Sequence, residues 1–171
     1  MTLVHSFAPI ADSRATRLIL GSMPGKASLA ASQYYAHPQN RFWPIIEAVL
    51  GVSASLSYEE RCLALRSRGV AVWDVLKMCT RTSSLDSDIV ESSIVANDFA
   101  EFFLAHPGIE RIYFNGAKAQ SVFQRHVVPA LTAFWAEIPQ VRLPSTSPAN
   151  ASIPRQIKLA QWQQLNGNCP G

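Results

Sequence analysis

The chain has 171 residues, of which 48% are hydrophobic and 16% are charged, and its formal net charge is +3. This composition excludes a disordered chain, and the length suits a single domain with a substantial core. No apolar run approaches the ~18 residues that a membrane-spanning helix needs, so we expect no membrane partner.

The cysteines and the N-terminus indicate the compartment. Cys62, Cys79 and Cys169 are odd in number and widely spaced, which favours reduced thiols in a cytoplasmic protein. No CxxC pair indicates a zinc site. The first ten residues, MTLVHSFAPI, have no basic region before their apolar part and do not predict a signal peptide.

The first predicted elements are an arm, a strand and a loop. Residues 1–15 are predicted to form a loosely ordered arm, and residues 16–20 a buried strand that stops at Gly21. Pro24-Gly25 favours a type II turn, in which glycine supplies a positive φ. Backbone N–H groups in the loop over residues 21–39 would then be free to face a ligand.

Two helices and a second strand are expected next. Apolar residues at helical spacing predict a helix from near Asn40 to Gly51. The SYEE sequence at residues 57–60 is a capping-box pattern that opens a second helix. A buried strand over residues 69–73 then ends at Asp74.

The second half of the chain continues this alternation. Residues 77–96 are polar and rich in serine, so we predict a long loop. A helix with three phenylalanines then precedes a strand over residues 109–114, which leads into Asn115-Gly116 and another helix. A short strand over residues 140–143 and a helix from near Pro154 complete the chain.

Strands that alternate with helices predict a parallel sheet with helices on both faces. We expect one α/β domain over residues 1–171, a three-layer α/β/α sandwich with a central four-stranded parallel sheet. Ligands of such sheets bind beyond the carboxyl ends of the strands. The residues at the predicted strand ends should therefore form one site: Gly21, Asp74, Asn115 and Ser145.

Acidic residues are unevenly distributed. Residues 13–46 and 138–171 contain no Asp or Glu but carry seven basic residues: Arg14, Arg17, Lys26, Arg41, Arg142, Arg155 and Lys158. A surface built from both segments would be electropositive and would suit a polyanion. Chance clustering in a lightly charged chain is the alternative.

The glycine loop at residues 21–25, GSMPG, excludes two common site types. It fails the GxxxxGK[ST] pattern of a nucleotide triphosphatase, because only three residues separate its glycines and Ala27 follows Lys26. It is also not a GxSxG elbow, so Ser22 is not expected to be a nucleophile.

The glycine loop, together with QYYAHPQNRFW at residues 33–43 (the first motif), resembles the uracil-DNA glycosylase superfamily. The pairing is most similar to the hypoxanthine-DNA glycosylase branch. PSTSPAN at residues 144–150 (the second motif) lies where that superfamily has its own second motif. Asn115-Gly116 extends the resemblance over most of the chain.

This resemblance implies a monofunctional, monomeric DNA glycosylase of base-excision repair that needs no cofactor and no metal. It would hydrolyse the N-glycosidic bond of a flipped-out deaminated base, with hypoxanthine favoured. A uracil or thymine mismatch glycosylase and a catalytically inactive nucleic-acid-binding module are the alternatives. The implied base pocket contains Gly21, Ser22, Met23, Pro24, Gly25, Tyr35, Phe42, Asp74 and Asn115, and the implied DNA-binding segment contains Ser145, Thr146, Ser147, Asn150, Ala151, Ser152 and Arg155.

Asn40 is the implied catalytic residue. Mismatch-specific relatives have a water-positioning Asn where this chain has Met23, and a thioether cannot orient water. Asn40 would take that role, although an Asn beside a helix start also serves as a cap. Tyr35 would stack on the extruded base.

The resemblance leaves two positions open. Leu143 stands where many members have His or Asn, so the departing base would be stabilised by the glycine loop N–H groups or by serines of the second motif. Asp74 would accept the N1–H of hypoxanthine, or else have a structural role such as pairing with Arg81. His37 is expected to pack beside Pro38.

Overall fold

The three-dimensional structure, a computed structural model, describes residues 2–167 of the chain, so Cys169 lies outside the described residues. Its centre is a sheet of four parallel strands in the order β3-β2-β6-β7. The strands are β2 (Arg17–Gly21), β3 (Val70–Asp74), β6 (Arg111–Asn115) and β7 (Gln140–Leu143). Every residue of β3 is buried, as expected for a parallel strand covered on both faces. The predicted four-stranded parallel sheet is confirmed.

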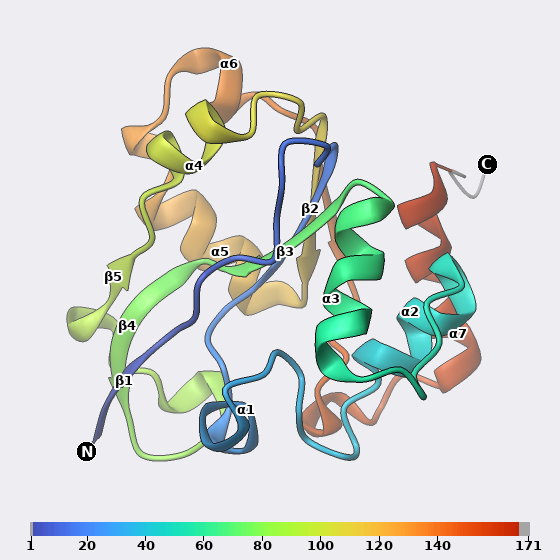
Figure 1. The fold of residues 1–171 in the computed structure, drawn as a ribbon. Helices are drawn as coiled ribbons and strands as arrows, with labels where there is room; N and C mark the ends of the chain where they lie inside the picture. The colour runs from blue at the N-terminus through green and yellow to red at the C-terminus, as the bar shows by residue number, and fades with distance from the viewer. Residues whose placement is uncertain (1, 168–171) are drawn as a thin grey trace.

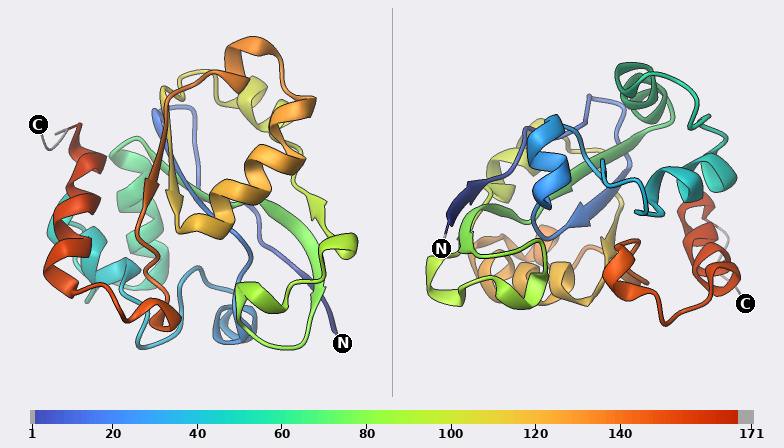
Figure 2. Two further views of the ribbon diagram at one scale, coloured as in Figure 1. Left: turned by 180° about the vertical axis from the view of Figure 1, so that it is seen from behind. Right: turned by 90° about the horizontal axis from the view of Figure 1, so that it is seen from below.

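Helices cover both faces of this sheet (Figures 1 and 2). One layer contains α2 (Phe42–Leu50), α3 (Tyr58–Ser67) and α7 (Arg155–Trp162), and the other contains α4 (Phe99–Ala105), α5 (Ala117–His126) and α6 (Ala133–Ala136). Trp73 stacks on Phe102 of α4, and Phe42 of α2 packs edge-on against Trp162 of α7. The three-layer α/β/α prediction is therefore confirmed. No helix among the described residues is both long and apolar enough to cross a membrane.

A second sheet corrects two predictions. It is antiparallel, in the order β1-β4-β5, and contains β1 (Thr2–His5), β4 (Leu76–Arg81) and β5 (Val95–Ala96). Within the predicted arm over residues 1–15, the described residues 2–15 are therefore not loosely ordered, since β1 pairs with β4 and the buried Ile10 bridges to Val72.

Residues 77–96 are likewise not one long loop. They contain most of β4, all of β5 and two 3-10 turns, η1 (Asp86–Asp88) and η2 (Glu91–Ser93). The inner face of β4 buries Cys79 and Arg81. A buried arginine breaks the apolar alternation by which a strand is recognised, which is why composition indicated a loop.

The loop predicted over residues 21–39 contains a short helix, α1 (Lys26–Ala31). Gly25 precedes it with φ −77° and ψ 177°, so the predicted type II turn with a positive φ at this glycine is wrong. The positive φ values of this segment fall instead at Ser32 and Tyr35. The following helix begins at Phe42, just after the expected start near Asn40.

Candidate functional site

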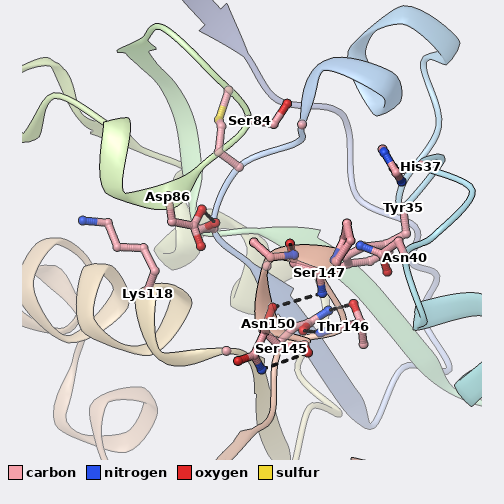
Figure 3. A pocket seen from close by; sticks show the side chains of 18 of the residues that line it. Tyr35, His37, Asn40, Ser84, Asp86, Lys118, Ser145, Thr146, Ser147 and Asn150 are labelled. Atoms are coloured by element: carbon pink, nitrogen blue, oxygen red, sulfur yellow. Dashed lines mark hydrogen bonds between the residues drawn. The ribbon is translucent and has the colours of Figure 1, made fainter. Parts of the chain in front are cut away.

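A cleft of about 880 Å³ opens at the carboxyl edge of the parallel sheet (Figure 3). Its walls are the glycine loop, the first and second motifs, and the segment around η1. All four residues predicted from the strand ends line it, namely Gly21, Asp74, Asn115 and Ser145. Figure 3 shows Asp86 and Lys118 on the opposite side of this pocket from Tyr35, His37 and Asn40.

Hydrogen bonds at Thr146 connect the two motifs. The Arg41 N–H donates to the carbonyl oxygen of Thr146 at 2.9 Å. Asn115 accepts from the Thr146 N–H through Oδ1 and donates to the Thr146 hydroxyl through Nδ2, each at 2.9 Å. Both ends of the Asn115 amide are thus used to hold the second motif in place. This leaves the motif, rather than a ligand, as the main partner of Asn115.

Gly116 allows the second motif to approach the sheet. Its φ is +97°, and an added Cβ would lie 3.0 Å from the Cβ of Ser145. Within the motif, the Ser147 N–H donates to Ser145 Oγ at 3.1 Å. Asn150 Nδ2 donates to the Ser145 carbonyl at 3.3 Å. The segment that would contact DNA is therefore preorganised by its own serines.

Lys158 does not belong to the exposed basic surface that the sequence indicates. It is only 4% exposed, and its ammonium donates to the carbonyl oxygen of Asn150 at 2.6 Å. Burial lowers the pKa of Lys158 from its usual value. Its long apolar stem is buried, and its ammonium group holds the backbone of the second motif at Asn150.

Two other basic residues lie away from the cleft. Arg14 pairs with Asp12 at 2.6 Å, and Arg17 donates to the carbonyl oxygens of Leu165 and Arg68. Arg17 begins β2, at the opposite end of the strand from Gly21. The expected electropositive surface is therefore smaller than predicted. Its exposed members near the cleft are Lys26, Arg142 and Arg155.

Tyr35 is held in an unusual conformation. Its φ is 56°, which is uncommon for a residue other than glycine and marks a position fixed by its surroundings. Its ring stacks on Phe42 with centroids 4.0 Å apart. Phe42 is fully buried and does not line the cleft, contrary to its prediction as a pocket residue; it supports Tyr35 from behind.

The Tyr35 hydroxyl is buried and makes no hydrogen bond of good geometry among residues 2–167, although the nearby Asn115 side chain acts against the rise in the Tyr35 pKa. Burial, followed by the nearby carboxylate of Asp74, raises the pKa of Tyr35 above its ordinary value. The phenol is therefore neutral and remains able to donate to a ligand.

Asp74 is the most perturbed acid of the site. It is 3% exposed, and its Oδ2 has no hydrogen-bond partner in the described part of the chain. Burial raises the pKa of Asp74 to about 7; the charge of Asp86 adds to this shift, and Arg81 opposes it. Arg81 donates to the Pro24 carbonyl, and the described residues contain no direct Asp74–Arg81 ion pair.

The raised pKa of Asp74 predicts a pH-dependent stability. The folded protein holds this proton up to about pH 7, whereas the unfolded chain releases it near pH 4. The stabilisation is fully present below about pH 4 and is lost as the pH rises through about 7. Asp74→Asn does not titrate, so its free energy of unfolding relative to wild type should increase from pH 5 to pH 8. Urea denaturation at both pH values measures this, and an unchanged difference would contradict it.

Asn40 lines the cleft and also hydrogen-bonds to the first residue of α2, whose N-cap position is held by Arg41. Asn40 Oδ1 accepts a hydrogen bond from the Phe42 N–H at 2.9 Å. Its Nδ2 has no partner among the described residues and is available to a ligand or a water molecule. His37 is exposed rather than packed as predicted, and its Nδ1 accepts from the Gln39 N–H at 3.1 Å.

The glycine loop presents backbone donors to the cleft. Among residues 2–167, no acceptor takes the N–H groups of Ser22, Met23 or Gly25. Ser22 Oγ donates to Asp86 Oδ1 at 2.6 Å, so its hydroxyl proton is already directed at a carboxylate. Such free N–H groups are suited to stabilising negative charge that develops on a leaving group.

Asp86 and Lys118 also line the cleft, although sequence reasoning did not find them. Asp86 lies in the segment predicted as a loop, and Lys118 pairs with Glu91. Neither carries a motif signal, because both reach the cleft only through tertiary packing. The predicted Ala151, Ser152 and Arg155 are exposed and do not line the cleft. The described residues contain no group of three or more His, Cys, Asp or Glu side chains placed to hold a metal ion.

Comparison with known proteins places this cleft in context. The model of the uracil DNA glycosylase superfamily matches residues 8–166. A hypoxanthine DNA glycosylase from Methanosarcina acetivorans is 32% identical over 162 residues, covering 94% of this chain and 96% of that protein. A second, from Methanosarcina barkeri, is 35% identical over 116 residues, covering 67% of this chain and 72% of that protein.

A solved structure has a similar fold. The solution NMR structure of a protein from Methanosarcina acetivorans, described there as a candidate uracil DNA glycosylase, superimposes with a TM-score of 0.79. It is 30% identical in sequence, and the match covers 96% of each chain.

Proposed function

The chain belongs to the uracil-DNA glycosylase superfamily, and we propose that it releases hypoxanthine from deoxyinosine in DNA by hydrolysing the N-glycosidic bond. The observation that carries this proposal is the cleft in which both motifs meet over the strand ends. The two relatives described as hypoxanthine DNA glycosylases support hypoxanthine as the base. We further propose that the protein is a cytoplasmic monomer that acts in base-excision repair without a metal ion.

In this proposal each wall of the cleft has one task. The base leaves the duplex and stacks on Tyr35, which Phe42 holds in place. Flipping the base out of the duplex costs about a few kcal/mol of lost stacking and pairing. Stacking on Tyr35 and hydrogen bonds to the edge of the base offset this cost. Asn40 holds the attacking water through its free amide group, while Oδ1 fixes the side chain on α2.

Charge develops on both fragments as the bond breaks. The sugar acquires oxocarbenium-like character, as in glycoside hydrolysis generally. The N–H groups of Ser22, Met23 and Gly25 would stabilise the negative charge on the departing base, which is the task that Leu143 cannot perform. Leu143 is buried and apolar, and serves to pack the end of β7.

Uracil is the second candidate base, because the similar NMR structure is described as a candidate uracil DNA glycosylase. Single-turnover excision separates the candidate bases when it is measured on duplexes of one sequence that contain deoxyinosine, deoxyuridine or a G·T mismatch. We expect the fastest release from deoxyinosine. Faster release of uracil or thymine would refute the preference for hypoxanthine but leave the reaction class intact. Binding without release of any base would indicate an inactive nucleic-acid-binding module.

DNA binding should depend on salt through the exposed arginines beside the cleft. Each DNA phosphate that the protein no longer neutralises reduces the slope of log K against log salt by ~0.9 for a duplex. The double variant Arg142→Ala/Arg155→Ala should therefore bind with a shallower slope in fluorescence-anisotropy titrations. Arg125 lies in the last turn of α5, and Arg125→Ala serves as the matched control. Equal slopes for the double variant and wild type would mean that these arginines lie off the DNA path.

A further inference from the structure

The Asp74 carboxyl group has no task in the hydrolysis proposed above for Tyr35, Asn40 and the glycine loop. It lines the cleft yet is 3% exposed, and its Oδ2 lacks a partner among residues 2–167. The neighbouring Tyr35 hydroxyl is also unpartnered there. Buried polar groups are nearly always hydrogen-bonded, and leaving them unpaired is costly. Two such groups in one cleft indicate that a ligand completes their hydrogen bonds.

Both groups converge on Gly21. A Cβ added to this glycine would lie 2.5 Å from Asp74 Oδ1 and 2.9 Å from the Tyr35 hydroxyl. The absence of a side chain at Gly21 therefore leaves room for the acid and the phenol to stand together. The ring of Tyr35 and the carboxyl of Asp74 are thus placed to contact the same base.

Burial, and then the charge of Asp86, favour the neutral form of Asp74, while Arg81 favours the charged form. On the sheet side is Arg81 of β4, but its guanidinium donates to the Pro24 carbonyl. From η1 comes Asp86, a like charge that hydrogen-bonds to Ser22, and from the first motif come the phenols of Tyr34 and Tyr35. The pKa of Asp74, raised to about 7, agrees with this arrangement. A charged Asp74 would also repel a base that leaves as an anion.

Building on the proposed function, we propose that Asp74 is the general acid that protonates the departing purine. As the C1′–N9 bond breaks, its electron pair stays with the base, and the Asp74 carboxyl proton moves to a ring nitrogen of that base. The water at Asn40 adds its oxygen to C1′ and releases a proton to solvent. The Asp74 carboxylate then takes up a proton from solvent, so one water is consumed for each neutral base released.

The pH dependence of single-turnover hypoxanthine release from a deoxyinosine duplex tests this role. Wild type should lose about tenfold in rate per pH unit above pH 7, because the acid form is being removed. Asp74→Asn should be slower by ~10²-fold at pH 6 and should show no such decline. Its binding to a duplex with an uncleavable 2′-fluoro-deoxyinosine should stay within a few-fold of wild type, which shows that the variant is folded.

Two controls separate Asp74 from its neighbours. Asp86→Asn removes the like charge that helps to raise the pKa of Asp74. The decline of the excision rate with pH should therefore begin at a lower pH, although Asp74 itself is unchanged. His37 is an ionisable side chain that also lines the cleft, so its contribution has to be separated from that of Asp74. In His37→Gln, the excision rate should begin to decline at the same pH as in wild type.

The analogue 7-deaza-deoxyinosine identifies the nitrogen that receives the proton. If wild type releases the base of this analogue as slowly as Asp74→Asn does, the proton goes to N7. If wild type remains faster than Asp74→Asn, the proton goes to N3. Either result supports Asp74 as the general acid. A wild-type rate that is flat between pH 6 and pH 9 overturns it, as does the same decline in Asp74→Asn. In both of those cases the released hypoxanthine upholds the proposed function. Absence of hypoxanthine at every pH overturns both proposals.

Discussion

Asn40→Ala should slow the chemical step of base release by ~10²–10⁴-fold, the loss expected when one positioning or acid–base group is removed. The amide group of Asn40 faces the cleft, and Met23 at the usual water-positioning place cannot take over its role. Single-turnover excision on a deoxyinosine duplex measures this step. Binding to an uncleavable deoxyinosine analogue should barely change, because phosphate contacts dominate DNA affinity.

Asn40→Ser is the matched variant that separates catalysis from capping. Asn40 Oδ1 accepts from the Phe42 N–H, so the alanine variant also loses a cap-like hydrogen bond at the start of α2, at about 0.5–2 kcal/mol of stability. Serine caps a helix nearly as well and should restore most of the free energy of unfolding. If the Asn40 amide positions the water, the serine variant should not restore turnover. Near-wild-type excision in either variant would refute Asn40 as the catalytic residue.

The second large effect is expected at Gly21. In Gly21→Ala the new methyl group would lie 2.5 Å from Asp74 Oδ1 and 2.9 Å from the Tyr35 hydroxyl, so both side chains must shift. Displacing cleft groups by about 1 Å is enough to cost ~10²-fold in rate. We therefore expect excision to fall by at least that factor in single-turnover assays, with overpacking adding a stability loss of about 1–3 kcal/mol.

Gly51→Ala provides the control for this variant. Gly51 ends α2 with φ +71°, and no atom lies within 4 Å of an added Cβ. Alanine there is strained by about 1–2 kcal/mol but lies remote from the cleft. It should lower the thermal midpoint while leaving excision unchanged. If Gly21→Ala is as active as Gly51→Ala, the region above Gly21 does not receive the base.

The parallel sheet and the cleft position follow from local sequence signals. Three apolar runs that lead into Gly21, Asp74 and Asn115 predict three of the strands and the edge where they deliver polar residues. The fourth strand, β7, is QVRL at the edge of the sheet, and its sequence signal is weaker. The runs of β2, β3 and β6 stand out because a parallel strand covered on both faces is a continuous apolar segment.

The second sheet did not follow from the sequence, for a physical reason. β4 buries Arg81 on its inner face, and the guanidinium is accommodated there by the Pro24 carbonyl. This bond depends on a loop 57 residues away in the chain, so no local pattern contains it. The same is true of Lys158, which reads as a surface cation until its carbonyl partner on Asn150 is seen.

The sequence predicts which residues line the candidate site better than it predicts their contacts and pKa values. The first motif indicates Tyr35 and Asn40, and a strand end indicates Asp74. The structure brings all three into one cleft. Phe42 was assigned to the pocket because of its place in the motif, but helix α2 turns it into the core beneath Tyr35. The raised pKa of Asp74 arises from burial and from Asp86, and neither can be read from a strand-end aspartate alone.

Hydrolytic excision of hypoxanthine is tested by base release from a deoxyinosine duplex in water labelled with heavy oxygen, with a chelator present. Mass spectrometry of the free base and of the DNA strand reports the outcome. We expect free hypoxanthine without the label and an intact strand whose abasic sugar carries one heavy oxygen at C1′. An unchanged deoxyinosine strand, or strand cleavage without hydrolytic release of the base, would contradict it.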